Sequence, residues 1–387
     1  MPQVDIDGLN STLKADVIRG QAGTSTKLGG DLDLNGNDIT GTGSIPAVSA
    51  QKNLIINGNF DIWQRGTSFA AIADSTYHAD RFQYSKGGTM VHTVSRSTDV
   101  PTVAESSYLS NYSVLIDCTT ADASIAAGDL CLLQQRLEGY NWATLAQQAI
   151  TLSFWHKHTK TGTYCVALRN SGVDRSYVAE YTQSVTDTWE KATINISASP
   201  SAGTWNYTTG IGVYLSWALA SGTDYHGTAD TWESANDLAT SNQVNACDST
   251  SNNFMIAQVQ LEAGSVATDF EIRNHATERI MCERYYEQSY DDGVATGTTT
   301  DTGAIMFRSN GTSHMDTLHY TTEKRTAPTI TLYSTSGGAS GNMYDRTAAA
   351  NKVSSASAIG TGRCRFEVVS SIDNNPYSGH YTINAEL

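Results

Sequence analysis

The sequence of 387 residues has little charge, little proline and no long apolar run. Only 16% of its residues are charged, against roughly 25% in an ordinary soluble domain. Acidic residues outnumber Lys and Arg, and the net charge of −15 excludes a nucleic-acid binder that works through a basic face. No apolar stretch approaches the roughly 20 residues of a membrane-spanning helix, so we expect no membrane insertion. The first residues also lack the pattern of a secretory signal.

The polarity of the chain comes from uncharged residues, because Ser, Thr, Asn and 32 Gly residues dominate. This composition argues against a helical bundle, which needs Glu, Lys, Leu and Ala. It favours short strands joined by turns. At roughly 150 residues per domain, the length predicts two or three domains.

Six cysteines are scattered along the chain, without a C-x-x-C pair or a Cys/His cluster of zinc-binding spacing. Without an export signal, scattered cysteines are typical of free, buried thiols in a protein made in a reducing cytoplasm. They are Cys118, Cys131, Cys165, Cys247, Cys282 and Cys364.

Residues 1–50 differ from the rest, because they contain no aromatic residue. Their apolar positions are separated by Gly, Asp and Asn, and such a segment is too weakly apolar to form a core alone. We predict that it becomes stable only by winding round copies of itself or packing on a partner; composition alone also fits a disordered tail. The candidate contact residues are Leu28, Leu32, Leu34 and Ile39.

Residues 51–275 show one strand pattern after another, separated by Gly-, Ser- and Asp-rich turns, which predicts an all-β, antiparallel β-sandwich. Residues 221–253 are polar and are predicted to form an extended loop. Residues 276–387 begin with a predicted short helix, Ala276–Tyr290, with Thr277 as its cap. A small C-terminal β domain follows.

Three segments together resemble bacteriophage tail fibre and receptor-binding proteins of the virion. They are Asn53–Phe69 with Ala79–Phe82, Gln258–Ser289, and Glu323–Ser334. The resemblance implies a carbohydrate-binding-module-like jelly roll, followed by a short helix and a C-terminal β unit. Residues Lys27–Ile39 resemble the N-terminal repeats of such fibres, which implies that residues 1–50 serve virion attachment and trimerisation.

The resemblance also bears on metal binding. Related jelly rolls often hold a structural calcium ion where the first and last strands meet, and Asp61 and Gln258 stand near the equivalent places. Gln258 stands where an acid is usual, and calcium prefers several carboxylates. We therefore expect no cofactor, with calcium at Asp61 and Gln258 as the alternative.

Glycan sites use aromatic rings that stack on the sugar, flanked by polar groups that fix its orientation. The aromatic and polar residues in loop-like contexts are therefore our candidate glycan contacts: Trp205, Tyr207, Tyr225, His226, Trp232 and Glu233. The tryptophans in predicted strands are expected in the core: Trp63, Trp155, Trp189 and Trp217. His156 and His158 share one strand face, which predicts a polar sheet edge or, at a trimer axis, a shared metal ion.

These observations lead to a homotrimeric phage virion fibre that is assembled in the host cytoplasm. It would dock on other virion proteins through residues 1–50 and bind a host surface polysaccharide through its β domains. The alternatives are a purely structural head-fibre, collar or tail adaptor protein and, more remotely, a glycan depolymerase. The sequence lacks the familiar catalytic motifs and any long β-helix repeat, so we expect no enzyme.

Overall fold

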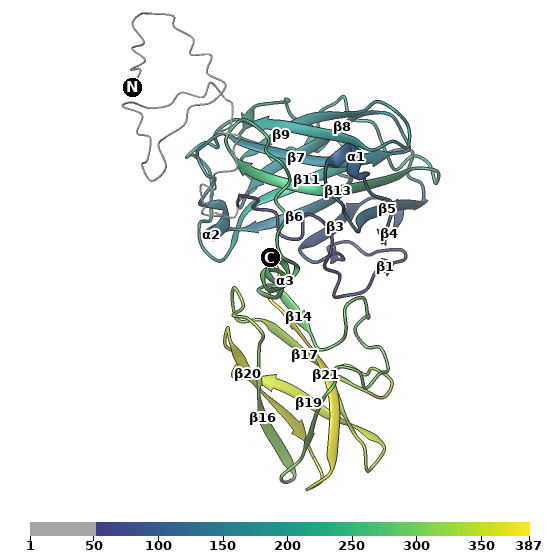
Figure 1. The fold of residues 1–387 in the computed structure, drawn as a ribbon, viewed down its shortest axis with the longest axis vertical. Coiled ribbons are helices and arrows are strands. Elements are labelled where there is room, and N and C mark those ends of the chain that lie inside the picture. Colours follow the sequence, from purple (N-terminus) through teal and green to yellow (C-terminus); the bar gives the residue numbers. More distant parts are fainter. Residues whose placement is uncertain (1–51) are drawn as a thin grey trace, which may run out of the picture. The chain divides into compact units, whose positions relative to one another are not determined.

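The computed structural model describes residues 52–387. The predictions for Leu28, Leu32, Leu34 and Ile39 therefore lie outside the described residues. Within that range the chain is almost entirely antiparallel β-structure, as the sequence predicted (Figure 1). No helix in this part of the chain is long and apolar enough to cross a membrane.

The first sheet of the sandwich has six antiparallel strands in the order β1-β4-β5-β13-β7-β10. Their bounds are β1 (Ser68–Phe69), β4 (Val91–Ser97), β5 (Ser113–Thr120), β7 (Ile150–His158), β10 (Glu190–Ile196) and β13 (Asn253–Ala263). The late strand β13 lies between β5 and β7, so the sheet closes only when residues far apart in the sequence pair.

The second sheet has seven antiparallel strands in the order β12-β9-β8-β11-β6-β3-β2. Their bounds are β2 (Thr76–Tyr77), β3 (Phe82–Gly87), β6 (Leu130–Glu138), β8 (Gly162–Asn170), β9 (Ser176–Gln183), β11 (Ile211–Ser221) and β12 (Trp232–Glu233). The predicted loop over residues 221–253 is largely a loop, interrupted only by β12 and the short helix η1 (Thr223–Tyr225).

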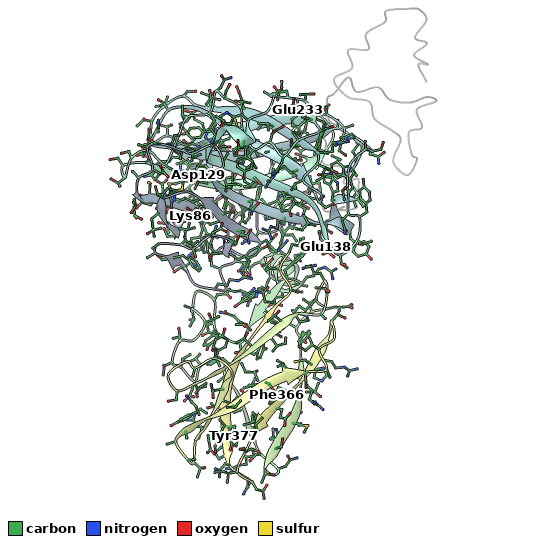
Figure 2. The ribbon with its side chains drawn as sticks, turned by 180° about the vertical axis from the view of Figure 1, so that it is seen from behind. Lys86, Asp129, Glu138, Glu233, Phe366 and Tyr377 are labelled. Carbon is green, nitrogen blue, oxygen red and sulfur yellow. The ribbon has the colours of Figure 1, made fainter. Side chains whose placement is uncertain are left out.

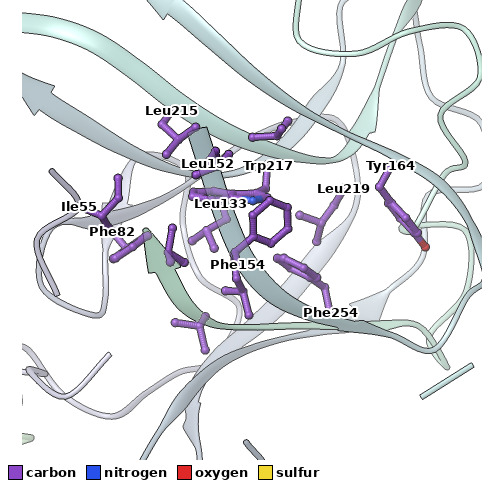
Figure 3. Packing of buried hydrophobic residues seen from close by; sticks show 14 of the residues in the cluster. Ile55, Phe82, Leu133, Leu152, Phe154, Tyr164, Leu215, Trp217, Leu219 and Phe254 are labelled. Atoms are coloured by element: carbon purple, nitrogen blue, oxygen red, sulfur yellow. The ribbon is translucent and has the colours of Figure 1, made fainter. Parts of the chain in front are cut away.

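The two sheets enclose one large aromatic core because alternate residues of each strand point inward. Phe154 of β7 meets Trp217 of β11 edge to face, with ring centroids 5.6 Å apart (Figure 3). The four tryptophans that were predicted to lie in the core are buried, although only Trp155 and Trp217 lie in strands. Trp63 and Trp217 lie in this core, whereas Trp155 and Trp189 belong to a separate buried cluster with Met255.

His156 and His158 also point inward, which contradicts the prediction of a polar sheet edge. Strand β7 lies between β13 and β10, so it is not an edge strand. The His158 ring stacks between Tyr164, with centroids 3.7 Å apart, and Phe254, with centroids 4.5 Å apart. Both imidazoles are 1% exposed, which also excludes a metal ion shared between chains at this pair.

The predicted helix over Ala276–Tyr290 is shorter in the structure, where α3 spans His275–Glu283. Its cap is Asn274, whose side chain accepts a hydrogen bond from the Ala276 amide at 2.9 Å, so the prediction of Thr277 was wrong. The chain then turns into β14 (Tyr286–Gln288), because these residues pair with the last strand of the third sheet. Two four-residue helices were not predicted, α1 (Val103–Ser106) and α2 (Gly139–Trp142).

The third sheet is built around β21 (Pro376–Asn384), which pairs with β14, β15, β17 and β18. The other strands are β15 (Ile305–Arg308), β16 (Ser313–His319), β17 (Thr329–Ser334), β18 (Asn342–Asp345), β19 (Ala350–Ser357) and β20 (Arg363–Val369). Its small core includes Phe366 and Tyr377, which Figure 2 labels among the side chains of this unit.

Polar contacts join this C-terminal unit and α3 to the sandwich. The carboxylate of Glu138, at the end of β6, accepts hydrogen bonds from Arg284 at 2.7 Å and from the Tyr285 hydroxyl at 2.7 Å. Arg325 donates to the carbonyl oxygen of Thr209 at 2.8 Å. Because Glu138 is 1% exposed, these bonds satisfy a carboxylate that would otherwise be costly to bury.

Candidate functional site

The structure brings two of the predicted glycan contacts, Trp205 and Trp232, against each other. Their ring centroids are 5.8 Å apart in an edge-to-face arrangement. Trp205 also stacks on the buried Trp142 at 5.8 Å, and Trp232 contacts Tyr177 at 5.5 Å. Both rings are half-buried and pack against the main core.

The indole N–H groups of this pair are already used within the protein. Trp232 donates to the carbonyl oxygen of Ser197 at 2.9 Å, and Trp205 donates to that of Ala202 at 3.0 Å. Ser197 directly follows β10, an edge strand of one sheet, and Trp232 lies in β12, an edge strand of the other. The two indoles therefore cover the core where the sheet edges meet, which gives them a structural role.

The other predicted residues lie on the same two loops. Tyr207 is 37% exposed. Tyr225 packs against a small apolar cluster on the outer face of the seven-stranded sheet, and His226 Nε2 lies 3.1 Å from the carbonyl oxygen of Ser221. Glu233, labelled in Figure 2, accepts hydrogen bonds from the amide and the hydroxyl of Thr228 at 2.7 and 3.0 Å.

A polar row crosses the outer face of the seven-stranded sheet, beside these loops. Tyr214 of β11 is the register partner of Arg136 on β6 and of Arg169 on β8. The two guanidinium carbons lie 5.5 and 5.2 Å from the centre of the Tyr214 ring, within the range of cation–π attraction. Tyr214 and Arg136 are half-buried, so part of the row reaches the surface.

A second row runs directly beside the first on the same face. Ser216 of β11 pairs with Gln134 of β6, and Gln134 pairs with Gln83 of β3. The Gln134 side chain donates to Gln83 Oε1 at 2.7 Å. Together the two rows form what we call the outer-face patch: Gln83, Gln134, Arg136, Arg169, Tyr214 and Ser216.

The outer-face patch contains buried polar atoms that have no hydrogen-bond partner within residues 52–387. They are Ser216 Oγ, Gln134 Oε1, and the Nε atoms of Arg136 and Arg169. An unpartnered buried polar group costs about 1–3 kcal/mol, so native proteins rarely leave such groups without a partner. The four atoms lie on neighbouring positions of one sheet face.

Arg169 is the most unusual member of the patch, because it is 8% exposed and forms none of the salt bridges within the described residues. Its Nη1 donates to Asn236 Oδ1 at 2.9 Å. Burial lowers the pKa of Arg169 to about 10, opposed by the nearby phenol groups of Tyr214 and Tyr225. The guanidinium is therefore still charged at neutral pH and has no carboxylate to neutralise it.

Glu233 borders the patch through Asp237, which follows Asn236 in the same loop. Burial raises the pKa of Asp237; a hydrogen bond from Ser176 opposes the shift, and the neighbouring Glu233 carboxylate adds to it.

Asp61 and Gln258, the candidate calcium ligands, take part in one hydrogen-bond network. The Gln258 amide nitrogen donates to the hydroxyls of Ser106 and Ser110, at 3.0 and 2.8 Å. The Ser110 hydroxyl reaches Asn59, whose side chain donates to Asp61 at 2.9 Å. A side-chain amide that donates through its nitrogen faces this network as a hydrogen-bond donor, so it offers no oxygen there to a cation.

The strand residues of the outer-face patch were missed by the reading of the sequence, which sought a site in loops. The missed signal is alternation: in β11 the apolar Val213, Leu215 and Trp217 alternate with Tyr214 and Ser216. Residues on the second face of a strand are ordinarily solvent-facing, so polarity alone did not mark them. Only the pairing of β11 with β6 and β8 shows that they gather.

No family model and no curated protein matches this sequence. The enzymatically active domain of tailspike protein 4 of bacteriophage CBA120 is similar at 13% identity and a TM-score of 0.27, over 50% of this chain and 21% of that chain. A putative sugar binding protein from Bacteroides thetaiotaomicron is similar at 12% identity and a TM-score of 0.33, over 55% of this chain and 100% of that chain.

The C-terminal family 22 carbohydrate-binding module of Clostridium thermocellum Xyn10B is similar at 16% identity and a TM-score of 0.28, over 51% of this chain and 97% of that chain. TM-scores and sequence identities this low support no statement about function. The role of the chain therefore has to rest on its own residues.

Proposed function

We propose that this chain binds a cell-surface glycan on the outer face of its seven-stranded sheet, as part of a phage virion fibre. The observation that carries the proposal is Arg169, a buried charge without a salt-bridge partner among the described residues. It lies beside Tyr214, near Ser216 Oγ and Gln134 Oε1, which have no hydrogen-bond partner there. A chain of sugars carries hydroxyl groups that both donate and accept, which suits all of these groups at once.

In this binding mode the guanidinium of Arg169 donates to sugar oxygens, and hydrogen bonds to a charged group contribute about 1.5–3 kcal/mol each. The half-buried Tyr214 offers part of its ring to the apolar face of a sugar. Tyr225, at the border of the patch, offers a second ring from the covering loop. Because only Tyr214 and Arg136 of the patch are half-buried and the other members are buried, we expect a weak single-site affinity.

Weak single sites suit a multivalent fibre, because linking several sites raises the overall affinity without any new contact. The sequence resemblance to phage fibres motivates the homotrimer and the attachment of residues 1–50 to other virion proteins. In the C-terminal unit, Val353 of β19 and Val369 of β20 are 63% and 43% exposed. We propose that these two side chains contribute to the trimer contact.

Binding is tested with the full chain on an array of bacterial surface polysaccharides and on host cells. Arg169→Met should lose at least about tenfold in affinity, as the loss of one or two charge-assisted hydrogen bonds implies. Arg175→Met is the matched control, because Arg175 is a nearby half-buried arginine outside the patch. Equal binding by both variants would contradict a site at Arg169.

Light scattering tests the assembly, and a trimer should give three times the chain mass of 41.6 kDa. A monomer at micromolar concentration contradicts the fibre model. The structural alternative, a head-fibre, collar or adaptor protein, predicts a trimer that binds no glycan or host cell. Time-dependent release of oligosaccharides from a bound polysaccharide would instead identify a depolymerase.

A further inference from the structure

Three buried ligand-type side chains meet at one place inside the sandwich, far from the outer-face patch. They are His92 of β4, Cys131 of β6 and Cys247, which precedes β13. One ligand atom from each lies within 4.8 Å of the other two. The side chains come from both sheets and from a loop, so the fold, and not sequence spacing, brings them together.

The distances within the group are close to those around a bound metal ion. Cys247 Sγ lies 3.8 Å from His92 Nε2, and the ligand atoms of all three residues lie within 4.8 Å of one another. In a tetrahedral zinc site, with Zn–S of about 2.3 Å and Zn–N of about 2.0 Å, neighbouring ligand atoms are about 3.5–3.8 Å apart. Small side-chain movements would therefore bring the three ligands to the spread that a zinc ion requires.

The His92 ring is held in place by a second residue. Tyr84 Oη lies 2.7 Å from His92 Nδ1, which leaves Nε2 as the nitrogen that faces a metal ion. Metal-binding histidines ordinarily use one nitrogen for the metal and the other for such an orienting hydrogen bond. Tyr84 also lies 3.6 Å from Cys131 Sγ, so it contacts two of the three candidate ligands.

Charge balance also suits a zinc ion, because both thiols bind a metal ion as thiolates and release their protons when it binds. Two thiolates with one divalent cation form a neutral unit, which removes the cost of burying a charge here.

A further thiol adjoins the group. Cys118 of β5 is the register partner of His92, and its thiol donates to the carbonyl oxygen of Cys247 at 3.8 Å. The remaining three cysteines lie elsewhere; for example, Cys165 contacts Thr240 at 3.7 Å. All six are free and buried, as predicted, but their spacing along the chain does not indicate that half of them share one region.

We propose that His92, Cys131 and Cys247 form a structural site for a zinc ion. Such an ion would join β4 of one sheet, β6 of the other and the segment before β13, and so lock the two sheets together at this point. Sulfur and nitrogen ligands select a borderline-soft cation over calcium or magnesium. Because all three ligands are at most 1% exposed, the ion must enter while the chain folds.

The test is metal analysis of the full chain, expressed in zinc-supplemented medium and also refolded with zinc or with chelator. We expect one zinc ion per chain and a higher melting temperature for the zinc-refolded protein. Cys131→Ser and Cys247→Ser should lose the zinc. The matched control is Cys165→Ser, an equally buried thiol outside the group that should keep it.

If the two serine variants do not fold, refolding of the wild-type chain with cobalt decides, because thiolate ligands give an intense near-ultraviolet charge-transfer band. Absence of that band, or of zinc in the wild-type chain, overturns the proposal. It is also overturned if zinc binds equally well to folded Cys131→Ser and Cys247→Ser. A disulfide between Cys131 and Cys247 in the isolated protein, seen in its intact mass, would overturn it as well.

Discussion

The interior of the sandwich and the outer face of its seven-stranded sheet both bury polar atoms without partners, but of different kinds. Inside, these are neutral ring nitrogens surrounded by other rings, such as His158 Nδ1 and Trp217 Nε1. On the outer face they belong to a charged guanidinium, a hydroxyl and an amide, at Arg169, Ser216 and Gln134. Good packing can offset the cost of burying a neutral polar atom that has no hydrogen-bond partner. Burying a charged group without a partner costs far more.

This comparison separates residues that stabilise the fold from residues that we propose to contact a ligand. Trp205 and Trp232 look like glycan contacts in the sequence, yet their N–H groups are satisfied and their rings cover the core edge. Tyr214 and Arg169 look like ordinary strand residues, yet they border the unmet groups. Changes to one region or the other, followed by measurement of stability or of glycan binding, test this contrast.

The largest effect should come from acidifying the interior. Burial lowers the pKa of His156 to about 4 and holds that of His158 well below its ordinary value of 6.5. Above pH 6.5 both imidazoles are neutral in the folded and the unfolded chain, so burying them costs no proton. As the pH falls below 6.5 toward their pKa values in the folded chain, the unfolded chain binds protons that the folded chain cannot, and the unfolding free energy decreases. Between pH 6.5 and 5, each histidine should cost about 2 kcal/mol of unfolding free energy.

Urea unfolding at pH 7 and pH 5 measures this loss. His158→Phe should reduce the pH dependence, because a phenyl ring suits the stack between Tyr164 and Phe254. His226→Gln is the control, since this histidine lies half-buried in a loop. If His158→Phe and wild type lose equal stability on acidification, the interior imidazoles are not the cause.

The second effect concerns the core edge. Trp232→Ala should lower the unfolding free energy by about 3 kcal/mol, because a large aromatic side chain leaves the edge of a packed core. Glycan binding should persist at temperatures where the variant is folded. The comparison is Tyr207→Ala, on a neighbouring loop and more exposed, which should change stability little. A folded Trp232→Ala that has lost binding would place the site at this edge.

The third effect concerns the charge on the outer face. Arg169→Met should leave the unfolding free energy unchanged or raise it, because it replaces an unpaired buried charge with an apolar chain of similar length. Denaturant midpoints of Arg169→Met and wild type provide the measurement. A destabilisation of several kcal/mol would mean that Arg169 supports the fold, and the contrast between the two regions would fail.

The smallest effect is expected at Ser216. Ser216→Ala removes a hydroxyl that has no partner, so stability should change by no more than about 1 kcal/mol. Glycan affinity should fall by less than the change caused by Arg169→Met, since a neutral hydrogen bond is weaker than a charged one. Calorimetric titration with the best glycan from the array would rank the two variants, and the reverse ranking would contradict this account.

The sequence predicts the fold class well, because alternation within single strands is a local signal. The same signal could not show which strands are neighbours, and that pairing alone brings Tyr214 beside Arg136 and Arg169. For the same reason the helix prediction extended into Tyr286–Gln288, whose strand conformation depends on β21.

The candidate site was predicted in part. Tyr225 and Glu233 border the outer-face patch, as loop residues chosen for their chemistry. A loop context does not reveal that the loops of Trp205 and Trp232 meet and cover the edge of the core, and glycan contact by these two rings stays a prediction. Sequence spacing could not predict that His92, Cys131 and Cys247 lie together, because their proximity depends on how the two sheets pack against each other.

The central place of β21 in the third sheet has a consequence for the order of events during synthesis. Strands β14, β15, β17 and β18 all pair with it, so these segments leave the ribosome well before their shared partner exists. Such distant pairings form late because their loops must close first. The sandwich, complete at residue 263, can fold while the rest is still being translated, and its zinc would have to be captured at that early stage.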